Sequence, residues 1–414
     1  CVVAYGHQPS ASTQTMPAAR AALEAIRVAA PQIPTAILGG HPSALPERTL
    51  REEPVDYVIE GEGPYTLEAY LSGAPFSTVP GLWYWGDGGM QKASPATRLK
   101  HLDTELPGVT WAALPPLKTY TAHNWHAVGF PDRSPYVAIH TTLNCPYRCS
   151  FCCIAAPFGG PGYLKWSPAH VVDEIGDLVE MAGVRHVKVI DEMFWLDEKH
   201  VEAICDKLIE RRLGDDLNIW AYARVDSIRR WMLLEKARRA GFRWLALGIE
   251  AADSKVRDGQ DKEFSDEQIR KTVWAIQQTG LSVIGNYIFG LPSDTMESMK
   301  RTLDLALELR CEWANFYPVI PFPGSQLYRN AVQNKLRLPD TWAGYAPLGY
   351  ECVPFAPDGL TPADVLRFRD MAFLRYFGDP EYLAMMQTKF GQAAVADILQ
   401  MVAAGPPKRK ILGY

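Results

Sequence analysis

Six short apolar runs alternate with amphipathic helical stretches over the second half of the chain. The runs predict strands at Tyr136–Thr142, His186–Asp191, Leu217–Arg224, Phe242–Glu250, Leu281–Gly290 and Trp313–Ile320. Helix starts lie between them, with Ser167 as an N-cap before Pro168 and with Ser265 and Gln268 as a capping box. Strands that alternate with helices pair in parallel, which predicts a βα barrel. A closed barrel of this kind has eight strands, so six predict an open, partial barrel.

The first of these runs leads into a loop that is rich in cysteine. The loop reads TTLNCPYRCSFCC over residues 141–153 and holds four of the eight cysteines of the chain. Within it, Cys145, Cys149 and Cys152 have the spacing C-x3-C-x2-C. Because the loop follows a barrel strand, we expect it at the mouth of the barrel, where the carboxyl ends of the strands carry the chemistry.

Disulfides, a zinc site and an iron–sulfur cluster are the three explanations for so many thiols. No secretion signal is found, so the compartment is expected to be reducing and disulfides are not expected. Structural zinc takes four ligands, usually as two C-x2-C pairs, but Cys205 and Cys311 stand alone in the sequence. Three thiolates on one loop suit a [4Fe–4S] cluster with one iron open to a further ligand. Cys153 is predicted to be a small buried residue; the alternative is a fourth cluster ligand, although adjacent cysteines rarely reach the same cubane.

The composition is that of a globular protein. The chain is 47% hydrophobic and 21% charged, with a formal net charge of -5, which gives no support for a nucleic-acid partner. No apolar run reaches the roughly 18 residues that a membrane-spanning helix needs. We therefore expect a cytoplasmic protein without a membrane span. The sequence begins at Cys1 within an apolar run, and we expect further residues to precede it.

Residues 1–75 alternate strands with helices and place glycines after the strands. A helix is predicted at Ala18–Ala30, and glycine-containing loops follow the strands at 6–13, 39–43 and 60–63. In a doubly wound sheet, ligands bind at the carboxyl ends of the strands, and glycine lets a ligand approach the backbone. One glycine turn alone carries no such meaning. The candidate ligand-binding residues of these loops are Ser10, Gly39, Gly40, His41, Glu60 and Gly61.

The rest of the chain divides into three further segments. Residues 76–133 are rich in Pro, Gly and Trp, and they are predicted to form a linker packed between domains. The barrel is assigned to 134–330 and a helical C-terminal region to 331–414. We expect the linker and the C-terminal region to cover the barrel mouth.

The segment CPYRCSFC resembles the cluster motif of the radical S-adenosylmethionine (SAM) superfamily, including an aromatic residue, Phe151, before the last cysteine. The segments AILGGHPSALPE and VDYVIEGEGPYTLEAYL resemble the later half of the Rossmann-like cobalamin-binding domain that precedes the barrel in one branch of that superfamily. The first half of that domain and the Asp-x-His-x-x-Gly motif have no counterpart in the sequence. The resemblance implies three cofactors, a [4Fe–4S] cluster, SAM and cobalamin.

The resemblance also assigns roles to the strand ends of the barrel. The implied SAM-binding residues are Phe151, Asp191, Glu192, Arg224, Gly248, Glu250, Asn286 and Ile288. Asp191 and Glu192 would hold the amino group of SAM, and Arg224 its carboxylate or a substrate acid. Gly248 and Glu250 would contact the sugar, with Asn286 and Ile288 near the adenine. The structural alternatives are an acidic helix start, a surface ion pair and simple turns.

The activity that the resemblance implies is methyl transfer to an unactivated carbon of a small molecule through a 5′-deoxyadenosyl radical. An external donor such as flavodoxin or ferredoxin would supply the electron. The alternative is an oxidoreductase or cyclase of the same family that does not methylate, and a non-enzymatic iron–sulfur carrier is a rival from another class. A methylthiotransferase would need three more cysteines before the barrel, where only Cys1 is present. The sequence does not identify the substrate.

Overall fold

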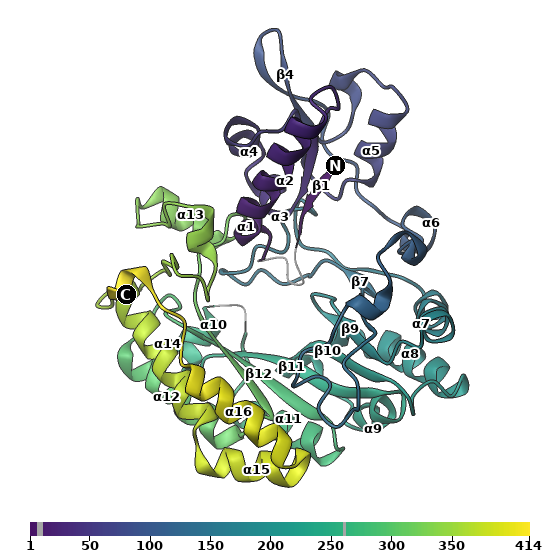
Figure 1. The fold of residues 1–414 in the computed structure, drawn as a ribbon. Helices are drawn as coiled ribbons and strands as arrows, with labels where there is room; N and C mark the ends of the chain where they lie inside the picture. Colours follow the sequence, from purple (N-terminus) through teal and green to yellow (C-terminus); the bar gives the residue numbers. More distant parts are fainter. Residues whose placement is uncertain (6–10, 260–261) are drawn as a thin grey trace.

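The computed structural model describes residues 1–5, 11–259 and 262–414, which form an α/β fold with two main sheets (Figure 1). The larger sheet has six strands in the order β13-β12-β11-β10-β9-β6, and every neighbouring pair is parallel. Its strands are β6 (Tyr136–Ile139), β9 (His186–Val189), β10 (Asn218–Arg224), β11 (Phe242–Glu250), β12 (Ser282–Phe289) and β13 (Trp313–Pro318). All six predicted strands are present, and the open partial barrel is confirmed.

Helices cover the outer face of this curved sheet (Figure 1). They are α7 (Pro168–Ala182), α8 (Glu198–Glu210), α9 (Met232–Arg239), α11 (Asp266–Gln278) and α12 (Met296–Leu309), while the short helix α10 (Ser254–Asp258) follows β11 at the mouth. Ser167 caps α7 by accepting a hydrogen bond from the backbone of His170, as its position predicts. Ser265 likewise accepts a hydrogen bond from the backbone N–H of Gln268, which is one half of the predicted capping box. Within the described residues, the exposed Gln268 side chain does not make the second hydrogen bond, to the backbone of Ser265.

The interior of the barrel ends in an aromatic floor. The ring of Trp125 packs against the rings of Trp220, Trp244 and Trp313, with centroids 5.3, 5.3 and 6.1 Å away. These three partners lie near the beginnings of their strands, at the end of the barrel opposite the cysteine loop. The linker segment around Trp125 therefore closes the floor of the barrel. For this part of the linker, the prediction that it covers the mouth is wrong.

The smaller sheet has five strands in the order β1-β2-β3-β4-β5. Its strands are β1 (Val2–Ala4), β2 (Ala36–Gly39), β3 (Tyr57–Ile59), β4 (Leu82–Gly86) and β5 (Gly89–Lys92), and its helices are α1 (Ala11–Gln14), α2 (Met16–Ala29), α3 (Gly40–Ala44), α4 (Pro46–Glu52) and α5 (Pro64–Leu71). The first three strands are parallel, whereas β4 and β5 add an antiparallel hairpin. This hairpin lies within the segment predicted as linker; the domain boundaries as a whole stay a prediction.

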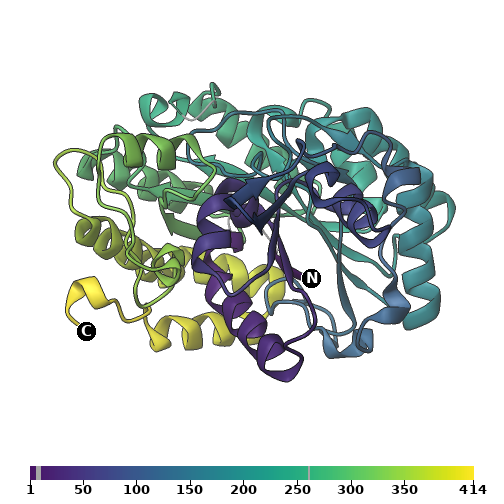
Figure 2. The ribbon, with the colours of Figure 1, turned by 90° about the horizontal axis from the view of Figure 1, so that it is seen from above.

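The smaller sheet stands over the barrel, as Figure 1 and the view from above in Figure 2 show. A short helix, α6 (Leu102–Glu105), and a small hairpin of β7 (Thr142–Leu143) with β8 (Leu164–Lys165) lie in the chain that leads into and out of the cysteine loop. The hydroxyl of Tyr5, just after β1, donates to Glu192 Oε1 at 3.3 Å, just after β9. The carboxyl ends of β1 and β9 therefore face each other across the mouth.

The C-terminal region is helical, as predicted, with α13 (Gln326–Gln333), α14 (Pro362–Phe377), α15 (Pro380–Phe390) and α16 (Gln392–Ala404). α14 packs along β13 and α12 at the side of the barrel, with α15 and α16 beside it, whereas α13 lies apart from these three helices (Figure 1). Tyr376 donates to the carbonyl of Cys311, and Tyr382 to that of Glu312, at the start of β13. Phe355 reaches the mouth, where its backbone N–H donates to Val319. Only a part of this region thus covers the mouth.

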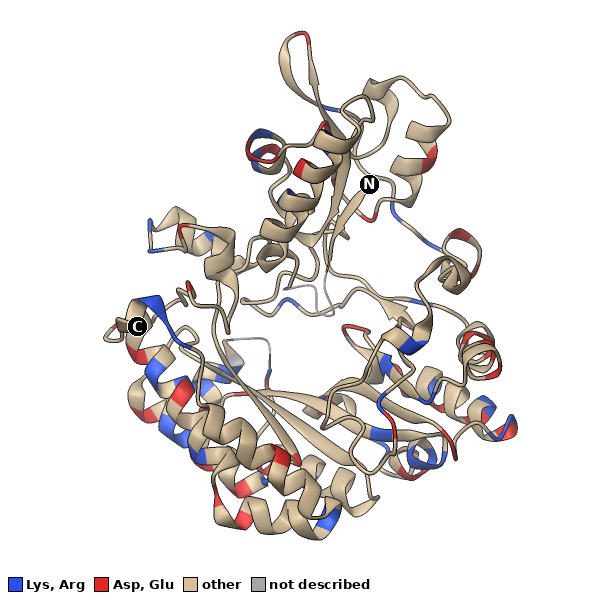
Figure 3. Ribbon diagram, in the orientation of Figure 1, with Lys and Arg blue, Asp and Glu red and all other residues tan. Residues whose placement is uncertain are grey.

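Basic and acidic residues are interspersed along the outer helices (Figure 3). The strands of the larger sheet carry few of them. Within the described ranges, no helix combines the length and the apolar character needed to cross a membrane.

Candidate functional site

The cysteine loop is anchored where β6 and β9 end. The Asp191 side chain is fully buried and accepts hydrogen bonds from the backbone N–H of Thr141 at 2.6 Å and from its hydroxyl at 2.5 Å. Burial raises the pKa of Asp191 to about 6, against the effect of these bonds. Both oxygens of this carboxylate are directed at the loop base. Asp191, which was predicted to hold the amino group of SAM, thus anchors the base of the cysteine loop through Thr141.

Asn144 shapes the start of the loop. Its backbone has a φ of 70°, in the left-handed region that Asn tolerates better than most residues. Its side chain accepts from the Cys145 N–H at 2.7 Å and donates to the Gly160 carbonyl at 2.9 Å. The Cys145 carbonyl then accepts from the N–H of Gly162 at 3.2 Å. These hydrogen bonds join the start of the cysteine loop to residues 160–162 and so fix its conformation.

The thiols of the loop differ in their exposure. Cys145 and Cys149 are partly exposed, Cys152 is exposed, and Cys153 is buried, as predicted for it. Burial raises the pKa of Cys153 to about 12. Across the described residues, no three His, Cys, Asp or Glu side chains gather around one ion position. A [4Fe–4S] cubane binds each thiolate through a different iron, and the three thiols of this loop supply the kind of ligand that such a cluster takes.

Glu192 lies between the loop and the smaller sheet. Its Oε2 accepts from the backbone N–H of Asn144 at 3.1 Å, and its Oε1 accepts from Tyr5. Burial raises the pKa of Glu192 to about 7. A ligand held at the carboxyl edge of the smaller sheet would therefore lie beside this carboxylate and the cysteine loop.

Arg224 ends β10 and points toward the cysteine loop. Its guanidinium pairs with Asp226, and Nη1 lies 3.9 Å from Cys149 Sγ. The structure therefore brings a predicted SAM-binding residue into contact with a predicted cluster ligand.

Glu250 ends β11 in a strained conformation, with a φ of 64° and a register shift between it and Gly248. Lys262 Nζ donates to Glu250 Oε1 at 2.6 Å and to the Gly248 carbonyl at 2.9 Å. Both charged side chains are buried. A Cβ at Gly248 would lie 2.5 Å from Lys262 Nζ, so a larger residue there would displace the ammonium from its present position. Sequence reasoning missed Lys262, which lies in no periodic pattern.

Two further candidates lie on β12. Asn286 donates to the Leu247 carbonyl at 3.1 Å and accepts from Asn315 Nδ2 at 3.0 Å, so it bridges β11 and β13. Ile288 belongs to a small apolar group at the mouth that includes Phe151 of the cysteine loop and Phe355. Phe151 and Ile288, which were predicted separately, are thus neighbours.

At the edge of the smaller sheet, Gly39 has a φ of 136°, and a Cβ there would lie 2.1 Å from the Ala4 carbonyl oxygen. Gly40 and His41 open α3, where sequence reasoning expected a loop. The His41 side chain is 1% exposed, and its ring meets Trp342 edge-on at 4.4 Å. Its Nδ1 lies 3.2 Å from Thr13 Oγ1, while Nε2 has no hydrogen-bond partner among the described residues. Burial and the nearby Arg48 lower the pKa of His41 to about 3.

Glu60 and Gly61 follow β3 at the same edge. Glu60 accepts from Trp83 Nε1 at 2.7 Å and pairs with Lys92 at 2.9 Å. Gly61 has a φ of 107° and donates to Ser43 Oγ at 3.0 Å. A Cβ at Gly61 would lie 3.8 Å from the Pro157 carbonyl, on the segment that leads out of the cysteine loop. Ser10 lies outside the described residues.

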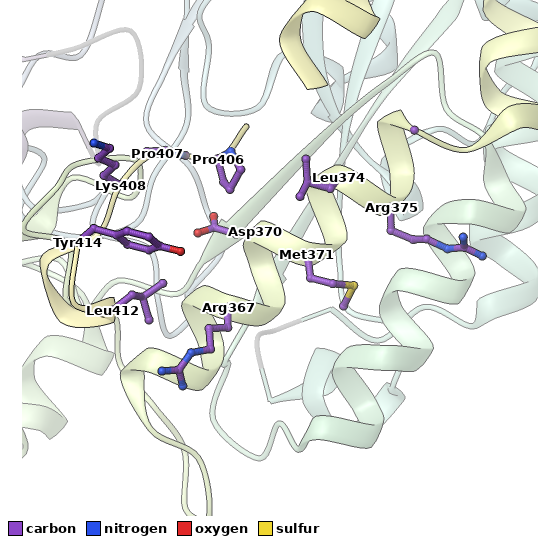
Figure 4. A pocket seen from close by; sticks show the side chains of 11 residues that line it. Arg367, Asp370, Met371, Leu374, Arg375, Pro406, Pro407, Lys408, Leu412 and Tyr414 are labelled. Carbon is purple, nitrogen blue, oxygen red and sulfur yellow. The ribbon is translucent and has the colours of Figure 1, made fainter. Parts of the chain in front are cut away.

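A separate surface pocket of about 690 Å³ lies between α14 and the C-terminal segment (Figure 4). Its lining residues are Arg367, Asp370, Met371, Leu374, Arg375, Gly378, Pro406, Pro407, Lys408, Leu412 and Tyr414. None of the candidate site residues lines it, so the barrel mouth remains the candidate active site.

Known proteins resemble this chain in sequence and in fold. Residues 139–306 match the family model described as the radical SAM superfamily. The uncharacterized methyltransferase PH0819 of Pyrococcus horikoshii is 27% identical over 321 residues, which cover 75% of this chain and 66% of that protein. The anaerobic magnesium-protoporphyrin IX monomethyl ester cyclase of Rubrivivax gelatinosus is 26% identical over 371 residues, which cover 87% of this chain and 63% of that protein. The chain thus spans less than two thirds of the length of these relatives.

Among solved structures, the radical SAM methyltransferase TsrM of Kitasatospora setae, with cobalamin and a [4Fe–4S] cluster bound, superposes with a TM-score of 0.67. The match covers 92% of this chain and 78% of that chain at 18% identity. At this identity the similarity establishes a shared fold.

Proposed function

Because residues 139–306 match the radical SAM superfamily and the chain shares the fold of a cobalamin-bound radical SAM methyltransferase, we propose that it is a cobalamin-dependent radical SAM methyltransferase that acts on an unactivated carbon of a small molecule. The observation that carries this proposal is the Tyr5–Glu192 contact. It joins the carboxyl edge of a Rossmann-like sheet, where ligands bind, to a loop with three available thiols.

The donor set at the mouth fits the iron–sulfur cluster and SAM. Cys145, Cys149 and Cys152 would hold the cluster, with Cys153 buried beneath them. Glu192, Gly248, Glu250, Asn286 and Ile288 are proposed to surround SAM, as their strand-end positions suggest. When bound, the cluster and SAM supply a radical that abstracts hydrogen from carbon, and cobalamin supplies a transferable methyl group.

The edge of the smaller sheet fits a cobalamin ligand in the part that is described. Gly39, Gly40, His41, Glu60 and Gly61 lie at the carboxyl ends of β2 and β3, and Gly61 lies near the Pro157 carbonyl on the segment that leads out of the cysteine loop. His41 Nε2 is a buried ring nitrogen without a hydrogen-bond partner among the described residues. We propose that His41 supports this edge without binding cobalt, because its ring is covered by Trp342.

The protein side chains hold this site rigid and partly dry. Thr141 with Asp191, and Asn144 with Glu192, fix the loop on two barrel strands, which would keep the thiols in place. The apolar group around Phe151 lines the mouth, and apolar walls help exclude water from a reactive radical.

The proposed setting follows from this chemistry. A thiolate-held cluster suits the reducing cytoplasm, and an external one-electron donor such as flavodoxin or ferredoxin is the proposed partner. A non-methylating oxidoreductase or cyclase is the second candidate, favoured by the similarity to the cyclase of Rubrivivax gelatinosus, which covers 87% of this chain.

Anaerobic reconstitution with iron, sulfide and hydroxocobalamin tests the proposal. The protein is then incubated with methyl-labelled SAM, a reductant and candidate small molecules, and products are identified by mass spectrometry. Labelled product, with equal amounts of S-adenosylhomocysteine and 5′-deoxyadenosine, supports the methyltransferase. An unlabelled product with 5′-deoxyadenosine supports the second candidate, and a reconstituted cluster that never cleaves SAM refutes both.

A further inference from the structure

Arg224 is held in one orientation at the end of β10. Its side chain is 6% exposed, and Nε and Nη2 each donate to a different oxygen of Asp226 at 2.9 Å. Two parallel hydrogen bonds between a guanidinium and a carboxylate fix the plane of the fork as well as its position. Asp226 thus binds the edge of the guanidinium that carries Nε and Nη2, and Nη1 belongs to the remaining edge.

That remaining edge faces the cysteine loop. The Arg224 guanidinium carbon lies 3.7 Å from the centre of the Tyr147 ring, and Nη1 lies 3.9 Å from Cys149 Sγ. Tyr147 and Cys149 are two residues apart in the loop. The ring supports the flat guanidinium from one side, and the N–H points toward the sulfur.

A donor at this sulfur changes what an iron–sulfur cluster can do. Hydrogen bonds to cysteine sulfur and nearby positive charge both stabilise the more negative, reduced state of a cluster, which raises its reduction potential. The Asp226 carboxylate offsets much of the positive charge of Arg224, but the N–H directed at the sulfur remains.

We propose that Arg224, aimed by Asp226 and Tyr147, raises the reduction potential of the cluster through the N–H that it directs at Cys149 Sγ. This inference rests on the proposed function, since it requires the cluster at Cys149. In this role Arg224 is a positioning residue that sets how readily the cluster takes up an electron. The role predicted for it from sequence, binding of the SAM carboxylate, is a separate function that SAM affinity measures.

The test compares midpoint potentials of the reconstituted protein without SAM, from redox titrations followed by electron paramagnetic resonance. Arg224→Met removes the charge and the N–H together. The double variant Arg224→Met/Asp226→Asn removes both members of the ion pair and leaves the net charge unchanged. Arg230→Met is the matched control, because Arg230 pairs with Glu202 on the surface and is 50% exposed. Iron content and circular dichroism are measured for each variant.

We expect a more negative potential in Arg224→Met and also in the double variant, with the control at the wild-type value. An unchanged potential in Arg224→Met overturns the inference. A double variant that returns to the wild-type potential also overturns it, because net charge alone would then explain the shift.

If Arg224→Met holds too little iron to titrate, Arg224→Lys decides, since Lys keeps the charge but lacks the planar fork. A lowered potential in Arg224→Lys supports the inference, and the wild-type value overturns it. A wild-type chain that assembles no cluster refutes the proposed function itself. An assembled cluster with an unchanged potential in the variants refutes only this inference.

Discussion

Replacing Lys262 with Met removes the ammonium that pairs with Glu250 and keeps most of the apolar stem. The two side chains are 6% and 9% exposed, and their charged atoms are 2.6 Å apart. The substitution therefore leaves a carboxylate with little water and without its cation. Breaking a buried pair on one side costs about 3–5 kcal/mol, because the remaining charge stays desolvated. We expect a loss near the lower end, about 3 kcal/mol, since Glu250 lies at the barrel mouth and keeps some contact with solvent.

The assay is urea unfolding of the protein before reconstitution, followed by far-ultraviolet circular dichroism. The double variant Lys262→Met/Glu250→Gln removes both charges, and we expect it to recover about 2 kcal/mol relative to Lys262→Met. The matched control is Lys271→Met, whose partner Glu267 is also 2.6 Å away but lies on the surface, with side chains 60% and 74% exposed. That pair should contribute less than about 1 kcal/mol. Equal stability of the single and double variants would refute the argument that a stranded buried charge sets the cost.

Three other predictions concern the loop, the barrel interior and the smaller sheet. Cys149→Ala should abolish the visible absorption of the reconstituted cluster and SAM cleavage, whereas Cys153→Ala should retain both; equal loss of iron in the two variants would contradict the ligand assignment. Burial lowers the pKa of Lys188 from 10.5 to about 8, so between these values the unfolded chain binds more protons, and Lys188 makes the free energy of unfolding rise with pH. Lys188→Met should remove that contribution in unfolding measurements across this range, and an identical pH slope would argue against it. Cobalamin-loaded protein in the cob(II) state should show no nitrogen superhyperfine splitting from His41 in electron paramagnetic resonance, and a splitting that disappears in His41→Ala would show that this ring binds cobalt.

The barrel strands could be predicted from the sequence because local sequence patterns define each of them. Each of the six strands is a short apolar run between helix signals, so periodicity and caps define it without knowledge of the fold. The cysteine loop was placed correctly for the same reason, since it follows the first of these strands directly. The burial of Cys153 also agrees with the prediction.

What the sequence did not predict depends on contacts between distant residues. Lys262 meets Glu250 across 12 positions, a contact that no local sequence pattern predicts. Trp125 lies in a segment whose Pro, Gly and Trp content indicated a linker, yet it packs on Trp220 and Trp244 from strands about a hundred residues further along the chain. β4 pairs with β3, and β5 pairs with β4, although the glycines of this segment favoured irregular structure. In these cases the tertiary partner, rather than the local pattern, determined the structure.

The aromatic floor of the barrel has an optical consequence. Trp125 lies within 6.1 Å of the rings of Trp220, Trp244 and Trp313, two of them in a T-shaped arrangement. Indole transitions this close couple to one another, so the four rings should act as one chiral chromophore with a distinct near-ultraviolet dichroic signal. Because they lie at the end of the barrel opposite the cysteine loop, their signal reports closure of the floor independently of events at the mouth. The protein thus carries an internal spectroscopic reference against which changes at the cofactor site can be read.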